Sequence, residues 1–101
     1  MKVVTVLTDV ANKGFQNFLL PTCEYYDIPL VVLQPENSYN YIGHRQKDVL
    51  LFEFLERDTD DNDIILFSDG HDTLLLANEH DILEKYHKFS ADLVFSAEIN
   101  C

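Results

Sequence analysis

The sequence predicts an α/β fold, in which a mostly parallel sheet carries helices on both faces. Short apolar runs alternate with longer segments whose apolar residues recur every three to four positions, in the order β-α-β-α-β-α-β. Because the short runs are apolar at consecutive positions, the strands are expected to be covered on both faces, as parallel strands usually are. The 101 residues, 47% of them apolar, are enough for one domain around one core.

The first part of the chain contains two predicted strands separated by a helix. Residues 2–7 are rich in β-branched side chains and form the first strand. Residues 12–26 have helical spacing, and Asn12 is a suitable N-cap. Pro21 is expected to kink or restart this helix, because proline lacks the N–H that a helix interior needs. Residues 30–33 form the second short strand.

The second part repeats the alternation. Residues 34–43 contain turn-forming residue types and predict a loop, and residues 45–56 predict a helix. The run 58–63 holds four aspartates but lacks the glycine and terminal glutamate of a calcium loop, so a solvated turn is expected. Residues 64–67 predict a third strand, 79–89 a third helix and 93–95 a fourth strand.

The charge limits the partners of the chain. Its formal net charge of -11 comes from 18 acidic and 7 basic residues, and such a field repels nucleic acid and anionic membranes. An anionic nucleotide would need a divalent cation between its phosphates and the carboxylates. We find no bilayer-spanning stretch and no signal-peptide core, and Cys23 and Cys101 lack metal-type spacing. A cytoplasmic protein without nucleic-acid or membrane partners is therefore expected.

Two carboxylates follow the third predicted strand. Ligands of parallel sheets bind at the carboxyl ends of the strands, where Asp69 and Asp72 stand. Both can converge on one hard cation such as Mg²⁺ or Mn²⁺, which prefers oxygen ligands. Gly70 is expected to supply a backbone conformation that other residues resist. The alternative is an ordinary turn whose aspartates bond their own backbone, with His71 as a solvated loop residue.

Five blocks in order carry a family resemblance. Residues 4–8 (VTVLT), 14–18 (GFQNF), 46–47 (QK), 67–72 (FSDGHD) and 93–98 (LVFSAE) resemble the glycosyltransferase domain of procollagen lysyl hydroxylases and their procollagen galactosyltransferase relatives. The similarity runs the length of the chain. The Asp-x-x-Asp after an apolar strand, followed about one helix later by Phe-Ser-Ala-Glu, is its most specific part.

The resemblance implies that residues 1–101 are the donor-binding part of a Rossmann-like, GT-A-type domain. It implies a UDP-hexose donor, a hydroxyl acceptor, and Mn²⁺ (or Mg²⁺) held by Asp69 and Asp72. Thr8 matches a nucleotide-contacting position, His71 the place of an aromatic residue near the uracil, and Lys47 a lysine of the donor pocket. The alternative for Lys47 is a surface lysine paired with a nearby acid. No catalytic residue is assigned.

The sequence also departs from its relatives. Tyr39 and Tyr41 are the candidates to replace a tryptophan near the base, and Glu98 either orients the sugar or is a plain loop carboxylate. The family's later histidine and acidic pair have no counterpart here. Two alternatives therefore stay open, a non-catalytic UDP- and metal-binding half-domain and a receiver-type phosphoacceptor domain built on Asp9 and Asp69.

Overall fold

A parallel sheet forms the centre of the structure. A computed structural model describes residues 1–35 and 43–97. In these ranges the sheet has the strands β1 (Lys2–Val6), β2 (Leu30–Leu33) and β3 (Ile65–Phe67), in the order β2-β1-β3. Both outer strands run parallel to β1, with Val4 opposite Val31 and Phe67. The predicted parallel α/β sheet is confirmed, and its carboxyl ends meet at one edge.

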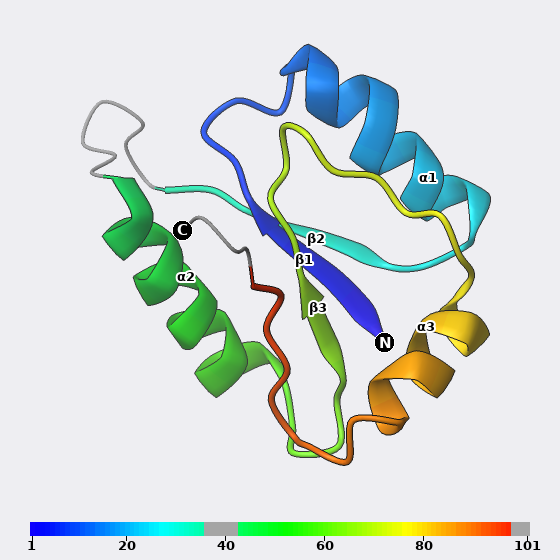
Figure 1. Cartoon of the computed structure of the whole chain (residues 1–101). Helices are drawn as coiled ribbons and strands as arrows, with labels where there is room; N and C mark the ends of the chain where they lie inside the picture. Colours follow the sequence, from blue (N-terminus) through cyan, green and yellow to red (C-terminus); the bar gives the residue numbers. More distant parts are fainter. Residues whose placement is uncertain (36–42, 98–101) are drawn as a thin grey trace.

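Helices cover both faces of this sheet, as predicted. The helical segments are η1 (Phe15–Leu19), α1 (Leu20–Tyr25), α2 (Gly43–Asp58) and α3 (Glu79–His87). Figure 1 shows α1 and α3 on one side of the sheet and α2 on the other. Val3 of β1 and Leu7, which follows β1 directly, pack against η1 and α1, and Phe54 of α2 is also buried. Successive strand residues point to opposite faces, which lets one apolar strand serve both helical layers.

The first helix begins where the sequence predicts and changes geometry before its proline. The side-chain oxygen of Asn12 accepts the backbone N–H of Phe15 at 3.1 Å, so Asn12 is the expected cap. The turn that follows is a π-helix, and the N–H of Leu20 bonds to the carbonyl of Phe15. Pro21 comes immediately after, near the start of α1. The wider turn lets the helix continue past a residue that has no N–H to donate.

Cys23 belongs to α1 and lies in the hydrophobic core. Its side chain is almost fully buried, and burial raises the pKa of the thiol, with a smaller contribution from Glu24. Since the thiolate is the reactive form, Cys23 is expected to resist alkylation in the folded chain at neutral pH and to react once urea unfolds it. Peptide mass spectrometry after iodoacetamide treatment checks this. Rapid labelling of Cys23 in the native chain would contradict its placement in the core.

The predicted fourth strand is wrong. Residues 93–95 pair with no strand in the described ranges, and Leu93 and Phe95 are 73% and 79% exposed. Leu93 and Val94 line a cavity of about 360 Å³ together with residues of β3 and α3. The carbonyl of Asp92 accepts the hydroxyl of Tyr86 at 2.7 Å, so this oxygen is already engaged. Residues 93–95 are apolar and lie beside the sheet, but their backbone does not join its hydrogen-bond ladder.

The remaining boundaries differ little from the predictions. α2 extends two residues further at each end than residues 45–56, and α3 ends two residues before the predicted end at 89. The acidic run is a turn, as predicted: Asp63 Oδ2 accepts the N–H of Asp60, and Asp60 Oδ1 accepts that of Asn62, both at 3.1 Å. Of the loop predicted at 34–43, residues 36–42 lie outside the described ranges. No helix in the described part of the chain is long and apolar enough to cross a membrane.

Candidate functional site

The aspartates predicted to bind metal lie on a loop at the carboxyl edge of the sheet, and we call residues 68–73 the aspartate loop. The N–H of Ser68 bonds to the carbonyl of Val4 at 3.0 Å and extends the β1–β3 pairing by one residue. The chain then leaves the sheet, and Asp69, His71 and Asp72 are all exposed. The sheet thus delivers both carboxylates to the edge where ligands of such folds bind.

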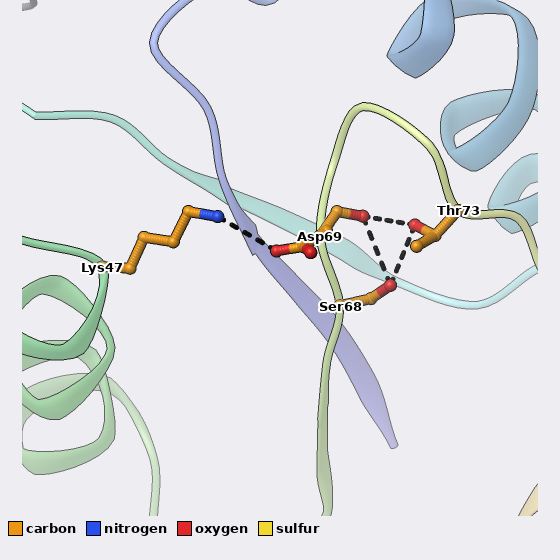
Figure 2. Close-up of polar contacts among 4 residues, drawn as sticks. All are labelled: Lys47, Ser68, Asp69 and Thr73. Carbon is orange, nitrogen blue, oxygen red and sulfur yellow. Dashed lines mark hydrogen bonds and ion pairs between the residues drawn. The ribbon is translucent and has the colours of Figure 1, made fainter. Parts of the chain in front are cut away.

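Two hydroxyl groups close the neck of the aspartate loop (Figure 2). Thr73 Oγ1 donates to the carbonyl oxygen of Asp69, four residues earlier. Ser68 Oγ lies 2.9 Å from Thr73 Oγ1 and 3.3 Å from the same carbonyl oxygen. Because Thr73 follows Asp72 directly, this closure folds the chain back and brings the backbone beside Asp72 next to that of Asp69.

Two glycines allow the aspartate loop to pack closely on the fold. A Cβ atom on Gly70 would lie 2.3 Å from Leu7 Cδ2, so Gly70 allows the loop to approach the chain just after β1 closely. Its φ is not in the left-handed region, and the expectation of a special backbone conformation at this glycine is wrong. A Cβ on Gly14 would lie 1.8 Å from the carbonyl oxygen of His71. Past the loop, the N–H of Leu75 donates to Thr22 Oγ1 at 3.0 Å.

Lys47 reaches the aspartate loop from α2. Its Nζ lies 3.0 Å from Asp69 Oδ1, and the two side chains are 24% and 60% exposed (Figure 2). The ion pair joins residues that are 22 positions apart, which the right-handed crossover between parallel strands makes possible. An exposed pair of this kind adds only about 0–1 kcal/mol of stability. Its main effect is to place a positive charge beside an acidic loop.

The structure brings two of the predicted site residues into contact and leaves the others apart. Lys47 and Asp69 are in contact. Thr8 follows β1 at the same edge, but its side chain and those of His71 and Asp72 are exposed and make no hydrogen bond or ion pair within residues 1–35 and 43–97. Tyr39, Tyr41 and Glu98, which the sequence also suggested, lie outside the described residues.

Sequence reasoning missed the residues that hold the aspartate loop in place. Ser68, Thr73 and Thr22 received no role, although a threonine four residues after an aspartate in a turn is a known type of local side-chain closure. Gly14 was noticed only as part of a family block. Gly14 contacts the backbone of His71, which is far away in sequence, so no local sequence pattern predicts this contact.

A second group of possible metal ligands lies on α3. His80, Asp81 and Glu84 have ligand atoms within 4.8 Å of one another, and all three are exposed. They are consecutive-turn neighbours on one helix, and Glu84 also pairs with Lys88 at 3.7 Å. Exposed acidic groups of this kind are common without a metal, and this group lies away from the carboxyl edge of the sheet.

The fold defines a partial Rossmann-like α/β domain with an acidic loop at the carboxyl edge of its sheet. The sequence matches the family described as "PLOD GT domain" over residues 1–101, and the chain belongs to this family. The resemblance stated from the sequence is thereby confirmed. The chain is a glycosyltransferase-related region.

Curated relatives agree with this assignment. The chain is 30% identical over 102 residues to procollagen-lysine,2-oxoglutarate 5-dioxygenase 1 of Homo sapiens. This alignment covers 95% of the chain and 14% of the relative. It is also 30% identical over 103 residues to procollagen-lysine,2-oxoglutarate 5-dioxygenase 2 of Mus musculus, with the same coverage. The chain thus spans about one seventh of the length of these relatives. The receiver-type alternative gains no support, because Asp9 Oδ1 accepts the N–H of Ala11 in a local turn.

Proposed function

We propose that residues 1–101 form the donor-binding part of a metal-dependent glycosyltransferase that transfers a hexose from a UDP-sugar to a hydroxyl acceptor. The observation that carries the proposal is the closed aspartate loop at the carboxyl edge of a sheet in a chain of this family. The relatives are named for procollagen lysine, which suggests a collagen-like protein as the acceptor.

The residues at the loop fit a hard divalent cation, Mn²⁺ or Mg²⁺. Asp69 and Asp72 offer carboxylate oxygens, and both are open to solvent and so to a substrate phosphate. Asp69 already binds one cation, the ammonium group of Lys47 at 3.0 Å. We propose that Asp69 and Asp72 hold the metal, whose chemical contribution when bound is to neutralise charge on the UDP leaving group.

The other residues of the edge would position the donor. Lys47 carries a positive charge that suits a phosphate oxygen, and the four-carbon stem of lysine lets its ammonium group turn from Asp69 to the diphosphate. Thr8 is proposed to hydrogen-bond the nucleotide from the end of β1, and His71 to stack beside the uracil. Thr8 and His71 follow β1 and β3 at the same edge of the sheet, and Lys47 contacts Asp69 there, which supports a single ligand for all three.

The chain by itself is expected to bind the donor without efficient transfer. Asp69 is 60% exposed, so the loop is open to water. Efficient transfer, in contrast, requires a site that excludes water. We therefore keep the non-catalytic UDP- and metal-binding half-domain as the second candidate. Slow or absent UDP release with a hydroxylysine acceptor, alongside measurable UDP binding, would favour this candidate over a complete enzyme.

Calorimetric titration of the chain with UDP, in Mn²⁺ and then in EDTA, tests the proposed function. We expect saturable binding in Mn²⁺ and a large loss of affinity in EDTA. ADP and GDP under the same conditions report whether the base is recognised. Equal UDP binding with and without metal would overturn the metal-dependent site, and no binding in either buffer would overturn donor binding.

Replacing Lys47 by glutamine is expected to change UDP and Mn²⁺ binding in opposite directions. UDP affinity in Mn²⁺ should fall about fivefold, equal to ~1 kcal/mol for one exposed charge pair. Mn²⁺ affinity without UDP should rise by a similar factor, because Asp69 loses the ammonium group that competes for it. Lys85→Gln on α3 is the control, since it removes the same charge away from the loop. If Lys85→Gln changed UDP and Mn²⁺ affinity as much as Lys47→Gln does, the effects would come from net charge alone.

A further inference from the structure

We infer that Thr73, assisted by Ser68, is a positioning residue that fixes Asp69 and Asp72 for cation binding; this inference rests on the proposed function. The neck of the aspartate loop is closed by the Thr73 hydroxyl on the Asp69 carbonyl. Ser68 supplies the second hydroxyl, 2.9 Å from Thr73 Oγ1. Neither residue is proposed to touch the metal, so both act through the two aspartates.

The closure depends on side chains because the backbone does not provide it. In the described ranges, no backbone N–H of residues 69–77 donates to a backbone carbonyl. The N–H of Leu75 donates to the Thr22 hydroxyl instead. The Thr73 hydroxyl is therefore the group that holds the two ends of the Asp69–Asp72 segment together, in the manner of a turn closed by a side chain.

The three contacts among Ser68, Thr73 and the Asp69 carbonyl support this assignment (Figure 2). The Thr73 hydroxyl has one proton, and it donates this proton to the carbonyl oxygen of Asp69. The proton of Ser68 then serves Thr73 Oγ1, with the Asp69 carbonyl as a longer second acceptor at 3.3 Å. Ser68 itself is tied to β1 through its N–H. The neck is thus linked to the sheet, and the sheet sets where the loop begins.

An open neck would weaken a metal site for an electrostatic reason. Two carboxylates close together repel each other, and a free loop relaxes by moving them apart. Binding a cation to such a loop must then reverse this relaxation and order the chain. The contacts of Gly70 with Leu7 and of Gly14 with His71 hold the base of the loop, and the hydroxyl neck holds its ends.

Thr73→Val and Thr73→Ser test the inference in the whole chain. Valine keeps the shape and removes the hydroxyl, whereas serine keeps the hydroxyl. We expect Thr73→Val to lower Mn²⁺ affinity about tenfold, which is the usual effect of losing an outer-shell partner of a metal ligand, and Thr73→Ser to stay within about twofold of the native chain. Affinity is read from the electron paramagnetic resonance signal of free Mn²⁺, with melting temperature measured on every variant.

The matched control is Thr59→Val. Thr59 Oγ1 donates to the carbonyl of Leu55, four residues earlier, at 2.7 Å, so the control removes the same kind of bond at the end of α2. Its Mn²⁺ affinity should equal that of the native chain. If Thr73→Val does not fold, Ser68→Ala carries the test, with an expected loss of about threefold, as for one neutral hydrogen bond.

The outcomes separate the two proposals. If the native chain does not bind Mn²⁺, the metal-dependent function is wrong and the inference is wrong with it. If the native chain binds Mn²⁺ and Thr73→Val binds it equally well, only the positioning role is wrong. Equal losses in Thr73→Val and Thr73→Ser would also overturn the inference, because the hydroxyl would then not be the group that matters.

Discussion

Asp69→Asn is expected to lower UDP affinity in Mn²⁺ about 100-fold or more, equal to ~2.8 kcal/mol. Asparagine keeps the shape of the side chain but removes the negative charge that a hard cation requires. It also releases Lys47, whose Nζ lies 3.0 Å from Asp69 Oδ1 in the native chain. The measurement is calorimetric titration with UDP in Mn²⁺, with melting temperature confirming that the exposed substitution leaves the fold intact.

Asp72→Asn should produce a loss of similar size, since the proposal gives both aspartates the same role. Asp81→Asn is the matched control, because Asp81 is an exposed aspartate within the second ligand group, on α3. Its UDP affinity should match that of the native chain. Undiminished binding in Asp69→Asn, or a loss in Asp81→Asn as large as in the loop variants, would move the metal away from the aspartate loop.

Gly14→Ala is expected to destabilise the fold by about 1–3 kcal/mol, as overpacking of a close contact does. Gly14 has helical backbone angles, so the exchange would stabilise an ordinary helix. Here the new Cβ would lie 1.8 Å from the His71 carbonyl oxygen, a backbone atom that cannot move without the aspartate loop. Mn²⁺ affinity should therefore fall together with the midpoint of urea unfolding.

Asn17→Ala provides the comparison for Gly14→Ala. Asn17 lies in the same helical segment and is exposed, so its replacement should leave stability and Mn²⁺ binding nearly unchanged. A Gly14→Ala chain that is more stable than the native one, with unchanged metal affinity, would show that Gly14 does not pack against the loop.

Local patterns were sufficient to predict most of the fold. Consecutive apolar residues marked β1, β2 and β3, and the Asn12 cap was confirmed by its bond to the N–H of Phe15. They failed at residues 93–95, which are apolar but exposed, because apolarity does not report whether a backbone has a hydrogen-bonding neighbour. They anticipated a break at Pro21, but the π-turn before it depends on a hydrogen bond that no residue type signals.

The candidate site was predicted in its charged residues and missed in its supports. Asp69 and Asp72 stood out because two carboxylates follow a buried strand, and the family resemblance added Lys47. An ion pair of Lys47 with a nearby acid was one of the predicted alternatives, but Asp69 was not predictable as the partner, because the contact depends on how α2 crosses the edge of the sheet. The Thr73 closure was missed for a different reason: a hydroxyl near an aspartate is common, and only the position of the Asp69 carbonyl shows what it bonds.

Paramagnetic broadening by Mn²⁺ in the nuclear magnetic resonance spectrum of the UDP-bound chain tests the central claim most directly, because it locates the metal on a residue map. We expect trace Mn²⁺ to broaden first the amide signals of residues 68–73, with Thr8 and Lys47 next. Broadening centred on His80, Asp81 and Glu84 instead, the other ligand group among the described residues, would contradict a metal-dependent donor site on the aspartate loop.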